Sequence, residues 1–142
     1  MASLESSSHT GKTCIRGIAE IVLWTHDLAR SVTFYRDLLG LEVISPPERK
    51  NPIFLKAGEG AIGIPQLVVL VQLPVQDSGP FESPRTLHHL AFEIAAADFD
   101  DEKARLESMG YTVRSGQHPV LPSRTMYIDD PEGNEVELIC ST

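Results

Sequence analysis

The sequence predicts an α+β fold built from two tandem copies of one βαβββ unit. Each copy begins with a short apolar strand, at residues 18–24 and 87–94, and continues into a helical stretch that ends at a glycine, Gly40 or Gly110. The two glycines lie 70 positions apart (110 − 40), whereas Glu20 and His89 lie 69 apart (89 − 20), so the copies repeat with one residue of slippage between them. Because one such unit cannot bury its apolar face alone, the two copies should pack into one body.

Module one covers residues 17–73 and contains the first predicted helix. Apolar residues at helical spacing indicate this helix, namely Leu28, Val32, Tyr35 and Leu39. Asp27 can cap its start, because an aspartate side chain accepts hydrogen bonds from free backbone N–H groups, and Gly40 ends it. Three further strands are predicted from β-rich segments at residues 41–45, 52–57 and 66–73.

Module two covers residues 85–140 and repeats this order. After the strand at 87–94, Asp98 is predicted to cap a helix that runs to Met109. Three strands are expected near residues 111–115, 124–129 and 135–140. The sequence DPEGN at 130–134 predicts the turn of the last hairpin, because proline fixes φ and Gly-Asn tolerates positive φ.

The segments outside the modules have the composition of connecting chain. Residues 1–12 are rich in Ser, Thr and Gly and predict a flexible tail, whereas residues 74–84 contain three prolines and predict a linker. Residues 1–142 are therefore expected to form a single domain. Cys14 and Cys140 do not have the spacing of metal ligands, and we expect both to be reduced thiols.

Composition restricts the possible partners of the chain. A net charge of −8 argues against nucleic acid and anionic membranes as partners, because both are bound through basic patches. No apolar run reaches the roughly 18–20 residues that a membrane span needs, and the first residues lack the apolar stretch of a signal peptide. The sequence thus predicts a cytoplasmic protein whose partner is a small molecule.

The two-residue period of the strands separates their apolar faces from faces that carry possible metal ligands. In the last strand, Val136 and Leu138 point one way and Glu137 points the other. The same alternation places Glu20 in the first strand, and His89 in the strand at 87–94, opposite the apolar face. If the strands curve around a common concavity, Glu20, His89 and Glu137 can converge there.

Three segments give the chain its resemblance to a known family: DLARSVTFYRDLLGL at 27–41, HHLAF at 88–92 and DPEGNEVEL at 130–138. Together they strongly resemble the vicinal oxygen chelate superfamily. This superfamily includes glyoxalase I, methylmalonyl-CoA epimerase, extradiol dioxygenases, fosfomycin-modifying enzymes and bleomycin-binding proteins. The resemblance implies two βαβββ modules that form an open, U-shaped, eight-stranded barrel with the helices outside. It also implies a homodimer, and metal ligands at Glu20, His89 and Glu137.

A fourth ligand position of the family holds no ligand here. The 69-residue offset between the copies places this position at Val68, and a slip of one residue places it at Leu67 or Val69. Gln66 or Gln72 would replace it only in a different strand register. The remaining Glu-His-Glu set suits Zn, Mn, Fe, Ni or Mg. Each residue also has an ordinary alternative: a solvated Glu137, a Glu20 paired with Arg124, or a hydrogen-bonded His89.

Other residues are candidates for supporting roles. Trp24, Phe54 and Tyr127 are expected to line a substrate pocket or to belong to the core. Arg124 is expected either to bind a substrate carboxylate or to form an exposed salt bridge. His88 is expected either to have a structural role or to hydrogen-bond a metal ligand without contacting the ion itself. His9, His26 and His118 are expected to be exposed.

The resemblance implies a divalent-metal-dependent enzyme that acts on a small metabolite through two neighbouring oxygens. Lyase or isomerase chemistry follows, with Glu137 or Glu20 moving a proton at a carbon next to a carbonyl. Two alternatives are an extradiol-type dioxygenase and a metal-free protein of the bleomycin-resistance kind that sequesters its ligand.

Overall fold

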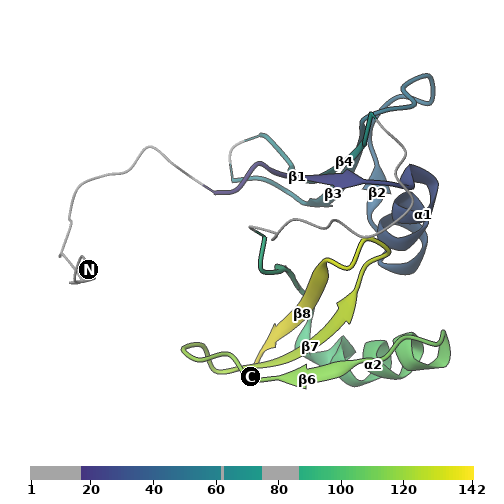
Figure 1. Ribbon diagram of the computed structural model, residues 1–142. Coiled ribbons are helices and arrows are strands. Elements are labelled where there is room, and N and C mark those ends of the chain that lie inside the picture. The colour runs from purple at the N-terminus through teal and green to yellow at the C-terminus, as the bar shows by residue number, and fades with distance from the viewer. Residues whose placement is uncertain (1–16, 62, 75–86) are drawn as a thin grey trace, which may run out of the picture.

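The computed structural model describes residues 17–61, 63–74 and 87–142, arranged as two similar modules (Figure 1). Module one contains β1 (Glu20–Thr25), α1 (Leu28–Val32), the π-helix η1 (Thr33–Leu38), β2 (Glu42–Val43), β3 (Ile53–Gly58) and β4 (Gln66–Gln72). Module two contains β5 (Leu90–Glu93), the 3₁₀ turn η2 (Ala96–Asp98), α2 (Phe99–Ser108), β6 (Arg114–Gly116), β7 (Ser123–Asp129) and β8 (Glu135–Ser141). The predicted tail at 1–12, Cys14, and the predicted linker beyond Pro74 lie outside the described residues.

The strands of each module form one four-stranded sheet, and both sheets have the same topology. The order is β1-β4-β3-β2 in the first sheet and β5-β8-β7-β6 in the second. In each sheet the first strand of the module pairs in parallel with the last, and the other pairings are antiparallel. The predicted α+β class and two-module plan are confirmed.

Local signals at the helix ends explain where the helices begin and end. The Asp27 side chain accepts a hydrogen bond from Arg30 N at 3.1 Å, so this predicted cap is confirmed. Gly40 and Gly110 have φ of 81° and 92°, values that glycine adopts without steric cost. Asp98 makes no side-chain cap hydrogen bond, because its backbone is already helical as part of η2. A capping residue instead needs an extended backbone, as Asp27 has.

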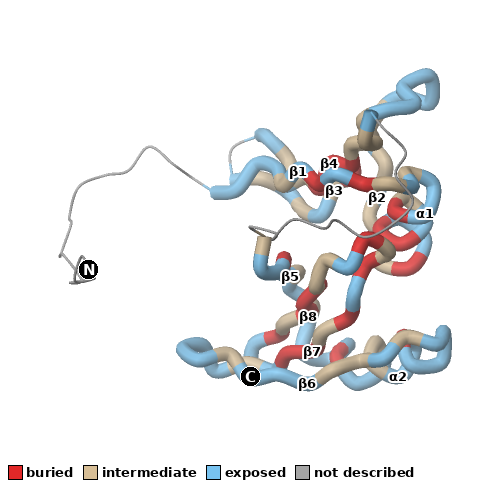
Figure 2. Tube along the Cα trace, in the orientation of Figure 1, coloured by how far each residue is buried: buried red, intermediate tan, exposed pale blue. Residues whose placement is uncertain are grey.

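The buried residues of both modules form one hydrophobic cluster (Figure 2). It joins Tyr35 of η1 and Leu106 of α2 to the inner sides of both sheets, and Val136, Leu138 and Cys140 of β8 are all buried in it. The predicted apolar face of the last strand is thus confirmed. None of the described helices is long and apolar enough to cross a membrane.

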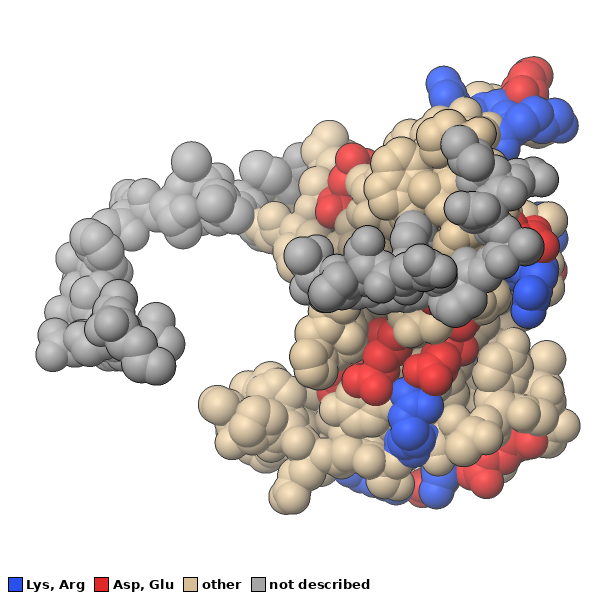
Figure 3. Space-filling view, in the orientation of Figure 1, with Lys and Arg blue, Asp and Glu red and all other residues tan. Residues whose placement is uncertain are grey.

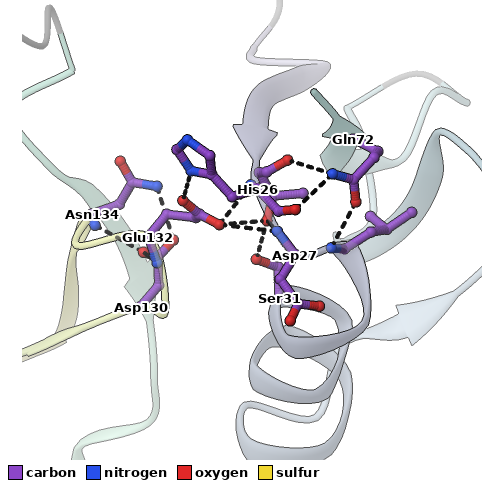
Figure 4. Close-up of polar contacts among 9 residues, drawn as sticks. His26, Asp27, Ser31, Gln72, Asp130, Glu132 and Asn134 are labelled. Atoms are coloured by element: carbon purple, nitrogen blue, oxygen red, sulfur yellow. Dashed lines mark hydrogen bonds and ion pairs between the residues drawn. The ribbon is translucent and has the colours of Figure 1, made fainter. Parts of the chain in front are cut away.

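A buried carboxylate joins the two modules (Figure 4). Glu132, in the turn between β7 and β8, accepts hydrogen bonds from Thr25 Oγ1 at 2.9 Å and from the backbone N–H of His26 at 2.6 Å. Its other oxygen lies 2.6 Å from Nδ1 of His26. Burial raises the pKa of Glu132, but the hydrogen bonds from His26, Thr25 and the backbone outweigh this effect, so the pKa falls below its ordinary value. The expectation that His26 is exposed was therefore wrong.

A tyrosine and a glutamine extend this junction between the modules. The hydroxyl of Tyr35 donates to Asp130 at 2.7 Å, and burial together with the charge of Asp130 raises the pKa of Tyr35. The side chain of Gln72 accepts from Leu28 N and donates to the carbonyl of His26 at 2.6 Å. Tyr35 thus holds η1 against the β7–β8 turn, and Gln72 of β4 holds the start of α1 within module one.

Candidate metal site

His89 and Glu137 meet on the face of the second sheet that lies opposite the core. β5 runs parallel to β8 with Ala91 opposite Glu137, and His89 precedes Ala91 by two residues and so shares its face. The Nε2 atom of His89 lies 3.0 Å from Oε2 of Glu137. The structure therefore brings together two of the three predicted ligands.

The carboxylate of Glu137 is buried, and one of its two oxygen atoms lacks a hydrogen-bond partner among the described residues. Glu137 is 3% exposed, and within the described part of the chain its Oε1 atom has no hydrogen-bond partner. Buried carboxylate oxygens are normally paired, so an unpaired one requires an explanation. A divalent cation explains it, because imidazole and carboxylate are ligands for Zn and related ions. The donor set fits a metal.

Tyr127 stands beside this pair. It lies opposite Glu137 in the β7–β8 register, and the centre of its ring is 6.2 Å from that of His89. Gly116 makes room for the ring, since a Cβ atom at this position would lie 2.1 Å from Tyr127 Cε2. Tyr127 is therefore placed to contact a small molecule bound at His89.

A second carboxylate and an arginine border the site. Donor atoms of His88, His89 and Glu135 lie within 4.8 Å of one another, and among the described residues this is the one group of three possible metal ligands that is so close. Arg114 holds Glu135 at 3.1 Å and Asp129 at 2.8 Å. Figure 3 shows acidic side chains next to a basic one on the half of the surface that module two forms. The sequence signal for Glu135 was its period of two with Glu137, but nothing local indicated Arg114.

Glu20 lies on the sheet of module one and does not join this group. It is exposed at the start of β1, on the same face as Val22 and Trp24, each of which is 54% exposed. Phe54 shares that face, since it pairs with Val69, which in turn pairs with Val22. The structure thus separates two predicted pocket residues, Trp24 and Phe54, from Tyr127.

The register also locates the missing fourth ligand. Val22 pairs with Val69 as Ala91 pairs with Glu137, so Val69 occupies the position in module one that Glu137 has in module two. Val68 is buried in the core cluster, and Gln72 is engaged at the start of α1. An apolar residue therefore stands where a fourth ligand would be.

Arg124 lies away from His89. Along β7 it points to the side opposite Thr125 and Tyr127, towards α2. There its guanidinium donates a hydrogen bond to Asp100 at 2.7 Å and stacks on the ring of Phe99, 4.2 Å from the ring centre. Arg124 therefore forms the exposed salt bridge that was one of its two expected roles, and the partner in this salt bridge is Asp100 and not Glu20.

Comparison with known proteins places these features in context. Residues 17–138 match the family model described as the Glyoxalase/Bleomycin resistance protein/Dioxygenase superfamily. The chain is 28% identical over 97% of its length to the catechol-2,3-dioxygenase of Bacillus subtilis, of which it spans only 43%. It is 27% identical over 87% of its length to the glutathione transferase FosA of Serratia marcescens, of which it covers 80%.

Solved structures show the same fold. Lactoylglutathione lyase from Agrobacterium tumefaciens aligns with a TM-score of 0.67 and 26% identity, covering 90% of this chain and 96% of that one. The fosfomycin resistance protein FosX from Mesorhizobium loti aligns with a TM-score of 0.63 and 22% identity, covering 90% and 94%.

Proposed function

Because the chain belongs to the Glyoxalase/Bleomycin resistance protein/Dioxygenase superfamily, we propose that it is a divalent-metal-dependent enzyme acting on a small metabolite through two neighbouring oxygens. The observation that carries the proposal is the buried, unpaired Oε1 atom of Glu137 beside His89. Family members act on varied substrates, so the reaction is inferred from the residues of the site. The native ion is one of Zn, Mn, Fe, Ni or Mg.

His89 and Glu137 hold the ion, and Glu20 completes the set from module one. When bound, a divalent ion supplies positive charge that stabilises negative charge on the substrate oxygens. Glu137 is 3% exposed, whereas Glu20 is exposed, and a carboxylate ligand of this kind could loosen from an ion and meet a substrate. Glu20 is therefore the base that takes a proton from the carbon next to a carbonyl and returns it to the neighbouring atom, which is isomerase or lyase chemistry. Tyr127 packs against the substrate.

The complete site requires a symmetric homodimer. Glu20 lies on a sheet face whose side chains Val22 and Trp24 are exposed, and Ile18 beside them is 67% exposed. A contiguous exposed apolar surface is typical of a protein interface, and two-fold pairing is the commonest closed assembly. In the proposed dimer, module two of one subunit covers this face of the other, so that the partner subunit's Glu20 would lie next to His89 and Glu137.

An extradiol-type dioxygenase is the second candidate. It is favoured by the similarity to the Bacillus catechol-2,3-dioxygenase along nearly the whole of this chain. Two histidines and one carboxylate, as in the His88, His89 and Glu135 group, also form a donor set that suits Fe(II). Oxygen consumption by the iron-loaded protein with catechols distinguishes this candidate from the first, which requires no oxygen.

Metal analysis of protein purified without chelators or nickel resin tests the proposal. We expect one divalent ion per chain in the wild type, and its loss in Glu137→Ala and His89→Ala with the fold retained. Glu107→Ala, on the exposed surface of α2, is the control and keeps the ion. If the wild type binds no divalent ion at any ratio, the enzyme proposal fails and a metal-free ligand-sequestering protein becomes the better explanation.

A further inference from the structure

A direct contact between two neighbouring histidines gives His88 a role. We infer that His88 is a positioning residue, which hydrogen-bonds the Nδ1 atom of His89 and thereby sets which nitrogen of His89 carries the proton. The inference rests on the proposed function, in which His89 is a metal ligand. It goes further by assigning a task to a residue that lies outside the ligand set.

The contact is short and oriented. The Nδ1 atoms of His88 and His89 are 2.7 Å apart, and their rings meet edge to face at 74° with centres 5.0 Å apart. Two nitrogens at this distance share one proton, because two lone pairs or two N–H groups would repel each other. One ring therefore donates and the other accepts.

The two nitrogens of His89 face different groups, because Nδ1 meets His88 and Nε2 faces Oε2 of Glu137 at 3.0 Å. In the neutral ring without an ion, Nδ1 of His89 accepts from Nδ1–H of His88, and the proton of His89 therefore lies on Nε2. If Nε2 held an ion, that nitrogen would be unprotonated, and the proton of His89 would lie on Nδ1 and be donated to His88. His88 must therefore serve as a donor in one state and an acceptor in the other, which imidazole does by exchanging tautomers.

The geometry favours this role over direct ligation by His88. Two ligands bound at about 2.1 Å lie roughly 3.0–3.4 Å apart, which exceeds the 2.7 Å between the two Nδ1 atoms. Glu135, whose carboxylate lies within 4.8 Å of donor atoms of both histidines, is already held by Arg114 at 3.1 Å. A Glu135→Gln variant tests the alternative, because loss of the ion from it would show that the His88, His89 and Glu135 group is itself the ligand set and would overturn the inference.

Metal affinity of the full chain is the first test. His88→Phe keeps an aromatic ring but removes both nitrogens, and we expect it to weaken zinc binding by about 10- to 100-fold with the stoichiometry at saturation unchanged. His88→Asn offers an amide group in the place of Nδ1 and should recover most of the affinity. Both variants should unfold at the wild-type temperature, because His88 is exposed. Equal zinc affinity in His88→Phe and the wild type would overturn the inference.

Nitrogen-15 spectra of histidine-labelled, metal-free protein test the inference independently of metal binding. They are recorded at mildly alkaline pH. We expect His89 to hold its proton on Nε2 in the wild type and to become a mixture of tautomers in His88→Phe. The same tautomer in both proteins would contradict the inference, even if the ion proves to bind. A wild type that shows the tautomer effect but binds no ion would refute only the proposed function.

Discussion

The carboxylate of Glu132 lies 2.6 Å from Nδ1 of His26, although 106 residues separate the two in sequence. Glu132 belongs to the turn of module two, and His26 follows β1, the strand that carries Glu20. The pair therefore holds the end of β1 against the turn that leads into β8, the strand of Glu137. Its integrity matters to the stability of the chain.

Replacing Glu132 with Gln should destabilise the chain. The amide keeps the shape of the side chain but removes the charge that strengthens its hydrogen bonds with Thr25 and His26. We expect a loss of about 1–3 kcal/mol in the free energy of unfolding, measured in urea at neutral pH. Glu107→Gln on the surface of α2 is the control and should change it by less than about 0.5 kcal/mol. Equal urea midpoints for wild type and Glu132→Gln would contradict the role of the junction.

The same carboxylate predicts how stability depends on pH. The pKa of Glu132 is lower in the folded chain than in the unfolded chain, so the unfolded chain takes up the proton first as the pH falls. This contribution is fully present above about pH 5 and is lost as the pH falls through the lowered folded pKa. Urea titrations at a series of pH values should therefore show the gap between wild type and Glu132→Gln closing towards acid. A gap that stays constant would rule out Glu132 as the source.

Charge on the exposed face of module one should prevent pairing. Trp24 is 54% exposed on this face, and a glutamate at position 24 would have to be buried without a partner in the proposed dimer. We expect wild type to scatter light as a dimer at micromolar concentration and Trp24→Glu to scatter as a monomer. Met109→Glu, an equally exposed apolar position after α2, should remain dimeric. A monomeric wild type would exclude the proposed assembly.

Mixing two defective chains tests whether the site is shared between subunits. Glu20→Ala and Glu137→Ala each lack one carboxylate of the proposed site. If the sites combine modules from two chains, a mixed dimer contains one intact site, so unfolding and refolding an equal mixture should restore about a quarter of the tight zinc sites. Each variant refolded alone is the control. No restoration, from a mixture shown to form mixed dimers, would contradict a site shared between subunits.

Much of the fold could be predicted from local signals in the sequence. Asp27 and Gly40 bound the first helical segment because capping and positive φ depend on neighbouring residues alone. The alternation along β8 gave the correct buried side, because one face of a paired strand packs on the core. Asp98 failed as a side-chain cap because a 3₁₀ turn precedes α2, and a short turn has little sequence signature.

The remainder depends on contacts between distant segments. The bond between Tyr35 and Asp130, and the environment of His26, arise only when the start of α1 meets the β7–β8 turn. Tyr35 lies at helical spacing from other apolar residues, and this spacing predicts that its ring is buried. The spacing does not predict that its hydroxyl donates to Asp130. Arg114 reaches Glu135 through the β6–β7–β8 register, which the sequence of three short strands does not specify.

In β8, residues that face the candidate site alternate with residues that pack in the core. Glu137 lies between Val136 and Leu138, so the residue that would determine chemistry is flanked by residues that hold the core. Substitutions at every second position can therefore change the reaction while the neighbouring positions preserve folding. A library that varies Ala91 and Tyr127 on the ligand-bearing face would explore new substrates with the packing of both modules left unchanged.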